Sequence, residues 1–225
     1  TLHQDSETGS KPSYFRGHHW GCIGILVQAC DKYFAVPLWA NIQEGLTLLA
    51  DSDEKRHLPK TVQIVEMARK TAMAMSTEAY LVLDAYFAVG PVFLAAAEHL
   101  NGVGNFVHIL TRAKKNVVAY CKPPARNKHQ RGRPREYGNK LKLITLFDAN
   151  CPFYNFQTTE ADIYGKNENI RYLVLDLLWK PVRGMLRFIL IESSHGRIIL
   201  MTSDLNLDPV TAIQLYCRRV TIETM

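Results

Sequence analysis

Two acidic residues in different settings are the main candidates for chemistry in this sequence. Asp84 interrupts the apolar run at residues 80–87 (YLVLDAYF), which we expect to form a strand. Burying an unpaired carboxylate is costly unless a cation or a metal ion compensates its charge. Because active-site groups emerge at strand ends in α/β sheets, Asp84 is a candidate metal ligand. The plainer alternative is an acid just past the strand, exposed or capping the turn.

The second acid, Glu223, belongs to a polar set on the last predicted helix. Asp208 offers an N-cap, proline follows at the first helical position, and a helix over residues 212–225 is expected. Tyr216, Arg219 and Glu223 then stand at i, i+3 and i+7 on one helix face. An Arg–Glu pair four residues apart is commonly a surface ion pair worth a few tenths of a kcal/mol. Spacing alone favours that simpler interpretation.

Taken together, these residues resemble one family. Tyr216, Arg219 and Glu223 are spaced as in the Y-x2-R-x3-E-x6-K signature of bacterial insertion-sequence DDE transposases. The preceding LMTSDLNLDP resembles the strand and turn that these enzymes place before that helix. Asp84 matches the second acid of their triad, and LHQDSETGSKPSYFRGHHWG resembles the segment after the first acid. The resemblance covers essentially the whole chain.

The resemblance implies an α/β fold of the ribonuclease-H-like type: a mixed sheet flanked by helices, with a β-rich insertion sub-domain. It implies three carboxylates that hold two Mg²⁺ (or Mn²⁺) ions, with Asp84 and Glu223 as catalytic metal ligands. The implied activity is cleavage and strand transfer at transposon ends, with water and then a 3′-hydroxyl as nucleophile. Tyr216 and Arg219 would contact the phosphate backbone there. The expected partners are the terminal inverted repeats and the target DNA, bound by a homodimer.

Two parts of the family pattern fall outside the sequence. The first acid is expected upstream of Thr1, and the signature lysine would follow Glu223 by seven positions, beyond Met225. We therefore expect a fragment that lacks its first core strand, has an exposed sheet edge and is inactive alone. The expected parts are residues 1–112 (first part of the catalytic core), 113–203 (basic segment and β-rich insertion) and 204–225 (terminal helix).

Positive charge is concentrated between residues 112 and 142. The chain carries a net charge of +6, and this segment alone holds eleven Lys/Arg and one acid, Glu136. Such concentration suits a polyanion, because each neutralised phosphate releases counterions. A solvated loop is the alternative. The RGRP at residues 131–134 is the core of an AT-hook, although a basic loop that touches DNA non-specifically is favoured. We assign DNA contacts to Arg112, Lys114, Lys115, Arg131, Arg133 and Arg135.

The elements that must position these residues follow from the apolar pattern. Residues 18–28 and 33–42 predict a hairpin of buried strands, and residues 61–75 predict an amphipathic helix. A helix over residues 92–100 and a buried strand over 105–110 follow. The β-type segments of the expected insertion are 141–147, 170–179, 185–192 and 197–202.

Composition sets outer limits on the protein class. The chain has 225 residues, 47% hydrophobic, which suits one large domain or a domain with an insertion. Its apolar stretches are shorter than the roughly 20 residues that span a bilayer, so no membrane is expected. Five cysteines without a C-x-x-C pair suggest reduced thiols in a cytosolic protein. The resemblance implies a cytoplasmic, nucleoid-associated bacterial protein. Trp179 could stack on an unpaired base, although core packing is favoured.

Two other functions stay open at this point. The chain could be a non-catalytic DNA-binding remnant of a transposase, which the absent first acid and the basic segment support. It could also be another ribonuclease-H-like nuclease that acts on RNA or hybrids, although the Tyr-Arg-Glu helix argues against this. Residues 193–196 (SSHG) lack an acid partner arrangement and predict a turn rather than a hydrolase site.

Overall fold

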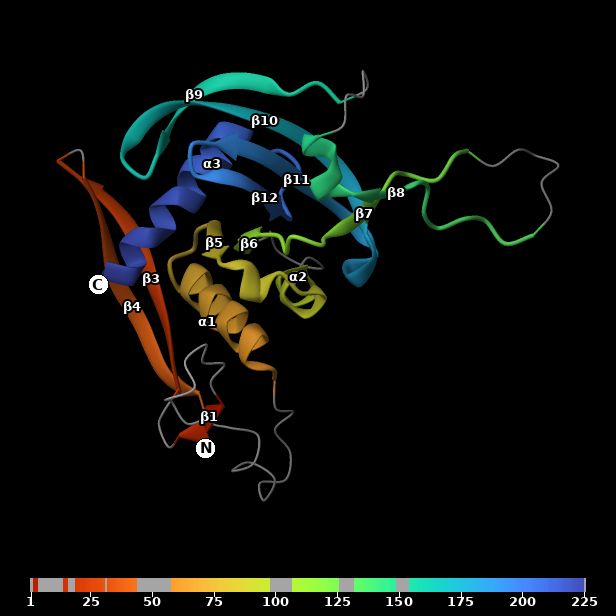
Figure 1. The fold of residues 1–225 in the computed structure, drawn as a ribbon. Coiled ribbons are helices and arrows are strands. Elements are labelled where there is room, and N and C mark those ends of the chain that lie inside the picture. The colour runs from red at the N-terminus through yellow and green to blue at the C-terminus, as the bar shows by residue number, and fades with distance from the viewer. Residues whose placement is uncertain are drawn as a thin grey trace.

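Eight of the strands that the structure describes join in one mixed sheet (Figure 1). The computed structural model describes residues 2–3, 14–15, 19–30, 32–43, 58–97, 107–125, 132–148 and 154–224. The strand order is β5-β6-β12-β11-β10-β7-β8, and β9 also pairs with β10. The bounds are β5 (Ala79–Leu83), β6 (Val107–Arg112), β7 (Val118–Tyr120), β8 (Lys140–Lys142), β9 (Gln157–Ile163), β10 (Lys166–Trp179), β11 (Gly184–Ser193) and β12 (Gly196–Thr202).

The part of the chain expected as an insertion continues the same sheet. β12 pairs antiparallel with β6, with Leu200 opposite Arg112 and Thr202 opposite Leu110. β5 and β6 form the one parallel pair among the described strands of this sheet. The prediction of an α/β protein with a mixed sheet flanked by helices is therefore confirmed.

Both faces of the sheet are apolar, because neighbouring residues of a strand point to opposite faces. On β6, Ile109 belongs to one buried cluster and Leu110 to the other. β12 alternates in the same way, with Ile199 in the first cluster and Leu200 in the second. The sheet thus needs a helical layer on each side, which is why its central strands read as continuous apolar runs.

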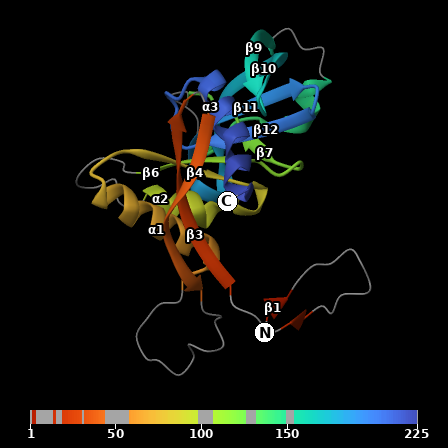
Figure 2. The same cartoon turned by 90° about the vertical axis from the view of Figure 1, so that its left-hand side faces the viewer.

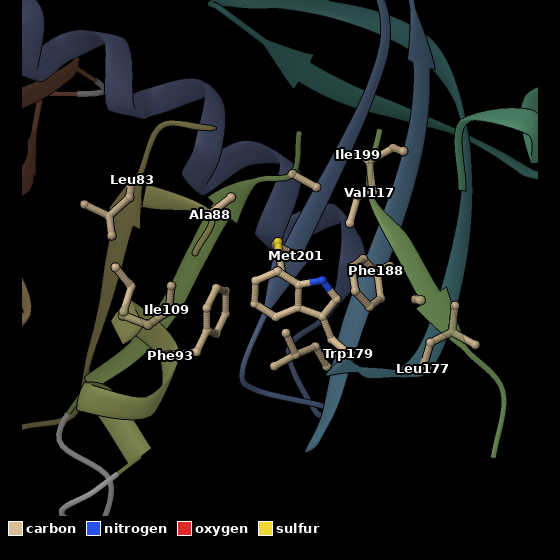
Figure 3. Packing of buried hydrophobic residues seen from close by; sticks show 14 of the residues in the cluster. Leu83, Ala88, Phe93, Ile109, Val117, Leu177, Trp179, Phe188, Ile199 and Met201 are labelled. Atoms are coloured by element: carbon tan, nitrogen blue, oxygen red, sulfur yellow. The ribbon is translucent and has the colours of Figure 1, made fainter. Parts of the chain in front are cut away.

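The first face is covered by α1 (Lys60–Ala74) and α2 (Gly90–Ala97). These two helices contact each other, and both pack against β6. Between α2 and the sheet, the indole of Trp179 meets the ring of Phe93 edge to face, with the ring centroids 5.5 Å apart. Figure 3 shows this cluster, which also contains Phe188 and Met201. The amphipathic helix predicted over 61–75 is confirmed as α1, with Met75 exposed at its C-cap.

The second face is covered by α3 (Pro209–Arg218), which packs against β5, β6 and β9. The predicted start of this helix is confirmed: the Thr211 N–H donates to Asp208 Oδ2 at 2.8 Å, and proline occupies the first turn. Such an N-cap contributes about 1 kcal/mol to helix stability. Ile213 is fully buried under the helix among the side chains of the second cluster.

β3 (His19–Ala29) and β4 (Lys32–Gln43) form the predicted hairpin, but it stands apart from the large sheet (Figure 2). The expectation that these strands are buried is wrong for most of their length. Ile23 is buried where α1 packs against the hairpin, whereas most large apolar side chains are exposed. The cause is that, among the described elements, mainly α1 and the 3₁₀ segment Arg219–Thr224 pack against the hairpin, which leaves much of its two faces uncovered. The exposed residues are Trp20, Val27, Phe34, Val36, Leu38, Trp39 and Ile42.

Several boundaries differ from those expected. The strand predicted over 141–147 ends at Lys142, and Leu143–Phe147 form a 3₁₀ helix, η3. Leu143, Leu146 and Phe147 are buried on this turn, so their spacing of three and four suits a helix better than a strand. The short strands β7 and β9 were not predicted. Near the start of the chain, β1 (Leu2–His3) and β2 (Tyr14–Phe15) pair in a separate two-stranded sheet. Among the described residues, no helix is long and apolar enough to cross a membrane.

A hydrogen bond ties the start of β5 to the segment that leads into α3. Tyr80 Oη donates to Asp204 Oδ2 at 2.6 Å, and the Tyr80 ring stacks on His108 with centroids 5.3 Å apart. Burial, followed by this hydrogen bond, raises the pKa of Tyr80 to about 12. Burial opposes ionisation of Asp204, but the hydrogen bonds from Tyr80 and the Asn206 N–H outweigh it and hold the Asp204 pKa below its usual range.

Replacing Tyr80 with phenylalanine is expected to lower the free energy of unfolding at neutral pH, because this bond is lost. A tyrosine in the unfolded chain ionises near pH 10, whereas Tyr80 in the folded protein ionises near about 12. The advantage of the wild type should therefore shrink as the pH rises from 10 to 12. Urea unfolding of both proteins across this range measures the difference, and a constant difference would contradict the assignment.

Candidate active site at the carboxyl edge of the sheet

Asp84 lies one residue beyond β5, not within it. The strand ends at Leu83, and Asp84 caps the 3₁₀ turn η2 (Ala85–Phe87) by accepting the Tyr86 N–H on Oδ1 at 2.9 Å. The residue is exposed. Of the two interpretations of this acid, the geometry matches the exposed, turn-capping one. The expectation that Asp84 lies within the strand is wrong, because the backbone turns away from the sheet at this residue.

The main chain of Asp84 is nevertheless fixed by a hydrogen bond from the neighbouring strand β6. The side-chain hydroxyl of Thr111 on β6 donates to the Asp84 carbonyl oxygen at 2.6 Å, and Thr111 is fully buried. Thr111 pairs with Leu83 across the parallel strands, which places the next residue of β6, Arg112, at the same edge. Asp84 and Arg112 therefore both lie at the carboxyl edge of the β5–β6 pair. Ends of parallel strands are common positions for functional groups.

The direction of α3 follows from the sheet topology. Since β12 runs antiparallel to β6, it ends near the amino edge of β5 and β6, where Ser203 Oγ accepts the Ile109 N–H at 2.9 Å. α3 starts a few residues later and crosses the second face, so its C-terminal end points back toward the carboxyl edge. Figure 1 shows α3 continuing to the end of the chain on the side of the molecule where β9 turns into β10.

Electrostatic effects on the buried Cys217 and on the partly exposed Tyr164 support this placement. Burial raises the pKa of Cys217 on α3 to about 11, and a hydrogen bond with the Tyr164 backbone acts against it. Burial also raises the pKa of Tyr164, which lies in the β9–β10 turn, while the charges of Arg219 and Arg112 oppose that rise. Arg219 and Arg112 thus lie within electrostatic range of one hydroxyl, although 107 positions separate them in the sequence.

Tyr216 and Arg219, the two predicted phosphate contacts, differ in their exposure. The Tyr216 side chain is 6% exposed and belongs to the apolar cluster beneath α3. Arg219 is half-buried, with its guanidinium 5.6 Å from the centroid of the Tyr216 ring. Its neighbour Arg218 lies 3.9 Å from the centroid of Tyr33 on the hairpin. The Tyr216 ring therefore supports the guanidinium of Arg219.

Glu223 lies in η5 (Arg219–Thr224), a 3₁₀ segment that follows α3. The expectation of one α-helix over 212–225 is wrong from Arg219 onward. The run Val220, Thr221 and Ile222 explains this end, because β-branched residues have low helix propensity and 3₁₀ turns are frequent at helix C-termini. The spacing of an α-helix, on which the predicted shared face depended, therefore does not hold between Arg219 and Glu223. Its side chain lies outside the described part of the structure.

The donor chemistry at this edge suits a hard cation only in part. Asp84 offers an exposed carboxylate with one oxygen engaged by a backbone N–H, which leaves lone pairs for a metal ion. Within the described ranges, no three or more His, Cys, Asp or Glu side chains converge as a metal site would require. The Asp84–Glu223 pairing stays a prediction, as does the third acid upstream of the chain.

The basic residues assigned to DNA separate into two places. Arg112 is half-buried at the carboxyl edge, and Lys114 and Lys115 are exposed in the turn that follows it. Arg133 and Arg135 are exposed between β7 and β8, and Arg133 forms an ion pair with Glu136. Arg131 lies outside the described residues.

The structure also separates the remaining candidates. Trp179 is buried against Phe93, so the core-packing interpretation is confirmed over base stacking. Sequence reasoning missed Tyr164, which has a left-handed φ of 54°, with its ring 5.2 Å from that of His195. The sequence signal for this turn is the Tyr164-Gly165 pair between two segments that alternate polar and apolar residues. Two-residue hairpin turns require positive φ angles, which glycine adopts readily.

Together, the fold and this edge define an α/β protein with a mixed sheet and one acid beside a cationic group at the carboxyl ends of two parallel strands. No protein-family model matches the chain, and neither does any curated protein.

Proposed function

We propose that this chain is the main part of a DDE transposase catalytic core, a metal-dependent enzyme that cleaves and transfers DNA strands at transposon ends. The observation that carries the proposal is the return of α3 to the carboxyl edge where Asp84 emerges. Two segments that match the family's second and third acids are far apart in sequence and approach the same edge. The ribonuclease-H-like type of the fold is part of the proposal.

In this proposal, Asp84 and Glu223 share two Mg²⁺ ions with an acid encoded upstream. Bound metal ions would supply activation of the attacking oxygen and stabilisation of the leaving one. The contribution of the protein is position. The Thr111 hydroxyl and the Tyr86 N–H fix the main chain and side chain of Asp84, so its exposed carboxylate is pre-oriented.

Arg219 and Arg112 would bind the DNA phosphates beside the acids. Arg219 stands over the Tyr216 ring, and a partly buried guanidinium with a fixed orientation can form bidentate contacts to a phosphate. Arg112 follows the residue that holds Asp84 in place. Two positive charges near one acid attract the DNA backbone to the reacting edge. DNA ends held by two copies of the enzyme would form the working complex.

The proposal also accounts for the separation of the hairpin from the large sheet. A ribonuclease-H-like sheet would be continuous, with a first strand between the hairpin and β5. On the outer side of β5 no described strand pairs with it, and the hairpin exposes Trp20 and Phe34. An upstream strand in that position would pair with β5 and cover apolar surface, and it would carry the first acid.

The proposal can be tested on the chain itself by titrating ¹⁵N-labelled protein with Mn²⁺. A paramagnetic ion broadens amide resonances near its site, so the amides of residues 84–86 and 219–224 should broaden together. Asp84→Asn should abolish the effect at both segments, because it removes a shared ligand. Asp148→Asn, which removes an exposed acid of η3 that pairs with Arg197, is the matched control and should leave the broadening intact.

Broadening at Asp84 alone, or at neither segment, would refute the shared metal site. Mn²⁺ serves as the probe because it accepts the same oxygen ligands as Mg²⁺. The measurement needs no cleavage by the chain, so the expected inactivity of the chain alone does not affect the result.

A non-catalytic DNA-binding remnant is the second candidate. Its support is that Asp84 already has a structural role as the cap of η2, which needs no metal. This function predicts salt-sensitive DNA binding that is indifferent to divalent cations and to Asp84→Asn. A nuclease for RNA or hybrids predicts instead a preference for RNA-containing substrates, which a panel of labelled duplexes decides.

A further inference from the structure

The chain between β7 and β8 extends away from the sheet as an arm of two limbs (Figure 1). We define the arm as the described residues 121–125 and 132–139. It is exposed for most of this length, and its side chains contribute nothing to either buried cluster except Cys121, which packs at its base. An arm of this kind has no core of its own, so its conformation depends on its base and on whatever binds it.

The base of the arm is fixed by backbone contacts that continue the β7–β8 ladder. The Cys121 N–H donates to the Asn139 carbonyl at 3.0 Å, and the Gly138 N–H donates to the Cys121 carbonyl at 2.9 Å. The two strands approach so closely at Gly138 that a Cβ there would lie 2.5 Å from the Lys122 carbonyl oxygen. Only glycine fits this position without displacing the backbone.

Aromatic and cationic side chains attach this base to the sheet. The rings of Tyr120 and Tyr137 lie 5.2 Å apart, one from β7 and one from the returning strand of the arm. Lys180, in η4 (Lys180–Val182) after β10, places its ammonium 5.2 Å from the first ring centroid and 5.6 Å from the second. Cation–π contacts of this kind contribute to the orientation of the arm. Prolines 123, 124 and 134 restrict the backbone beyond it.

The exposed side chains of the arm are mainly basic. Lys122, Arg133 and Arg135 are exposed, and the one acid described there, Glu136, pairs with Arg133. Elsewhere in the described structure, cations such as Arg171, Arg187 and Arg197 are matched by acids. The cations continue onto β8, where Lys140 and Lys142 are exposed and Leu141 between them packs against the core. The result is a surface with a net positive charge along the described part of the arm and β8.

This surface lies at the opposite end of the sheet from Asp84. β10 runs the length of the sheet, with the Tyr164 turn at its start and Leu178, which pairs with Tyr120 of β7, at its end. Asp84 follows β5 at one end of the strand order, whereas the arm joins β7 and β8 at the other end. The arm therefore leaves the sheet at a different edge from the one that Asp84 follows.

We infer that the arm is a second site for duplex DNA, separate from the carboxyl edge, and that it lies along a groove of the double helix. The ligand class rests on the proposed function. The major groove of B-DNA admits an α-helix or a two-stranded ribbon, and the two limbs of the arm are paired in this way at its base. Arg133 and Arg135 stand two residues apart, about 6–7 Å along an extended chain, which is close to two rises of about 3.4 Å along the duplex axis. The fixed base aims this ribbon outward, so a duplex at the arm leaves the acid-bearing edge free for a different DNA segment.

The test is the salt dependence of duplex binding, measured by fluorescence anisotropy with a labelled 30-base-pair duplex. The arm variant carries Lys122→Gln, Arg133→Gln and Arg135→Gln. The matched control carries Lys60→Gln, Arg69→Gln and Lys70→Gln on α1, so both lose the same charge. The arm variant should bind about 10-fold more weakly, and its slope of log affinity against log salt should fall by about 2–3. The control should change less than about twofold.

A charge-neutral variant separates the position of the arm from its charge. Gly138→Ala forces the two strands apart at the base and should weaken binding although no cation is lost. Equal losses in the arm variant and the α1 control would overturn the inference, because binding would then follow net charge alone. Tighter binding of an RNA duplex than of the DNA duplex, lost in the arm variant, would also overturn it.

The same variants keep this inference distinct from the proposed function. Mn²⁺ broadening around Asp84 should be unchanged in the arm variant. If DNA binding depends on the arm and no metal site exists, the arm inference stands and the transposase proposal fails. If the metal site exists and the arm variant binds DNA as the wild type does, the proposed function stands and this inference fails.

Discussion

Replacing Trp179 with alanine is expected to lower the free energy of unfolding by about 3–5 kcal/mol, the usual cost of deleting a large aromatic side chain from a core. The indole is 7% exposed and meets Phe93 edge to face. It lies where α2 packs on the sheet, so its removal leaves a cavity between two layers that can close only by moving a helix. Urea unfolding monitored by circular dichroism measures the loss.

Trp20→Ala is the matched control for this substitution. Trp20 is 61% exposed on the separate hairpin, so its replacement should change the free energy of unfolding by less than about 0.5 kcal/mol. The pair also tests the alternative role of Trp179 in stacking on an unpaired base. A stable Trp179→Ala protein with weakened binding of single-stranded DNA would support stacking and contradict the core role.

The central sheet was predictable because its strands carry a strong and simple signal. Apolar runs such as those at 170–179 and 185–192 lie wholly within β10 and β11, and β11 is buried on both faces over residues 188–191. The order of the strands was not predictable in the same way. Pairing of β12 with β6, which makes the expected insertion part of the main sheet, depends on long-range packing that local sequence does not encode.

The candidate site shows where local patterns stop being informative. The position of Asp84 at the edge of β5 was predictable from the apolar run, but not the turn that begins there. That turn depends on the Tyr86 N–H and on Thr111 of another strand. Helical spacing predicted a common face for Tyr216 and Glu223, yet the α-helix ends at Arg218 because β-branched residues follow. The burial of Tyr216 is a tertiary effect, because the cluster around it includes Ala161 and Ile163 of β9 and Leu110 of β6.

The arm shows the reverse case, in which composition was informative and geometry was not. The cluster of cations between 112 and 142 predicted a polyanion-binding segment. It could not show that Arg112 lies at the edge with Asp84 while Arg133 lies at the far end of the sheet. That separation follows from the chain crossing the sheet after β6 to reach the edge of β10. One basic segment in sequence is therefore two surfaces in space.

Asp84→Asn is expected to reduce DNA cleavage by about 10³-fold or more in a protein extended at both ends to include the upstream acid and the downstream lysine. The reason is that an amide is a weaker metal ligand than a carboxylate and carries no charge to balance the cation. Glu223→Gln should have a similar effect, and the double variant should lose little more than either alone, because both ligands serve one metal site. Cleavage of labelled duplexes that carry the element's own terminal repeats, with Mg²⁺ or Mn²⁺, measures the rates.

Three controls distinguish a loss of catalysis in Asp84→Asn from a loss of folding or of DNA binding. Asp148→Asn, the exposed acid used as a control above, should cleave at the wild-type rate. Affinity for the same duplex should stay within about twofold in Asp84→Asn, since the DNA contacts lie on Arg112, Arg219 and the arm. Asp84 also caps η2, and asparagine can accept the same Tyr86 N–H, so the turn survives the substitution. Normal cleavage by both Asp84→Asn and Glu223→Gln would end the transposase assignment, because a capping acid with no catalytic partner is then all that Asp84 can be.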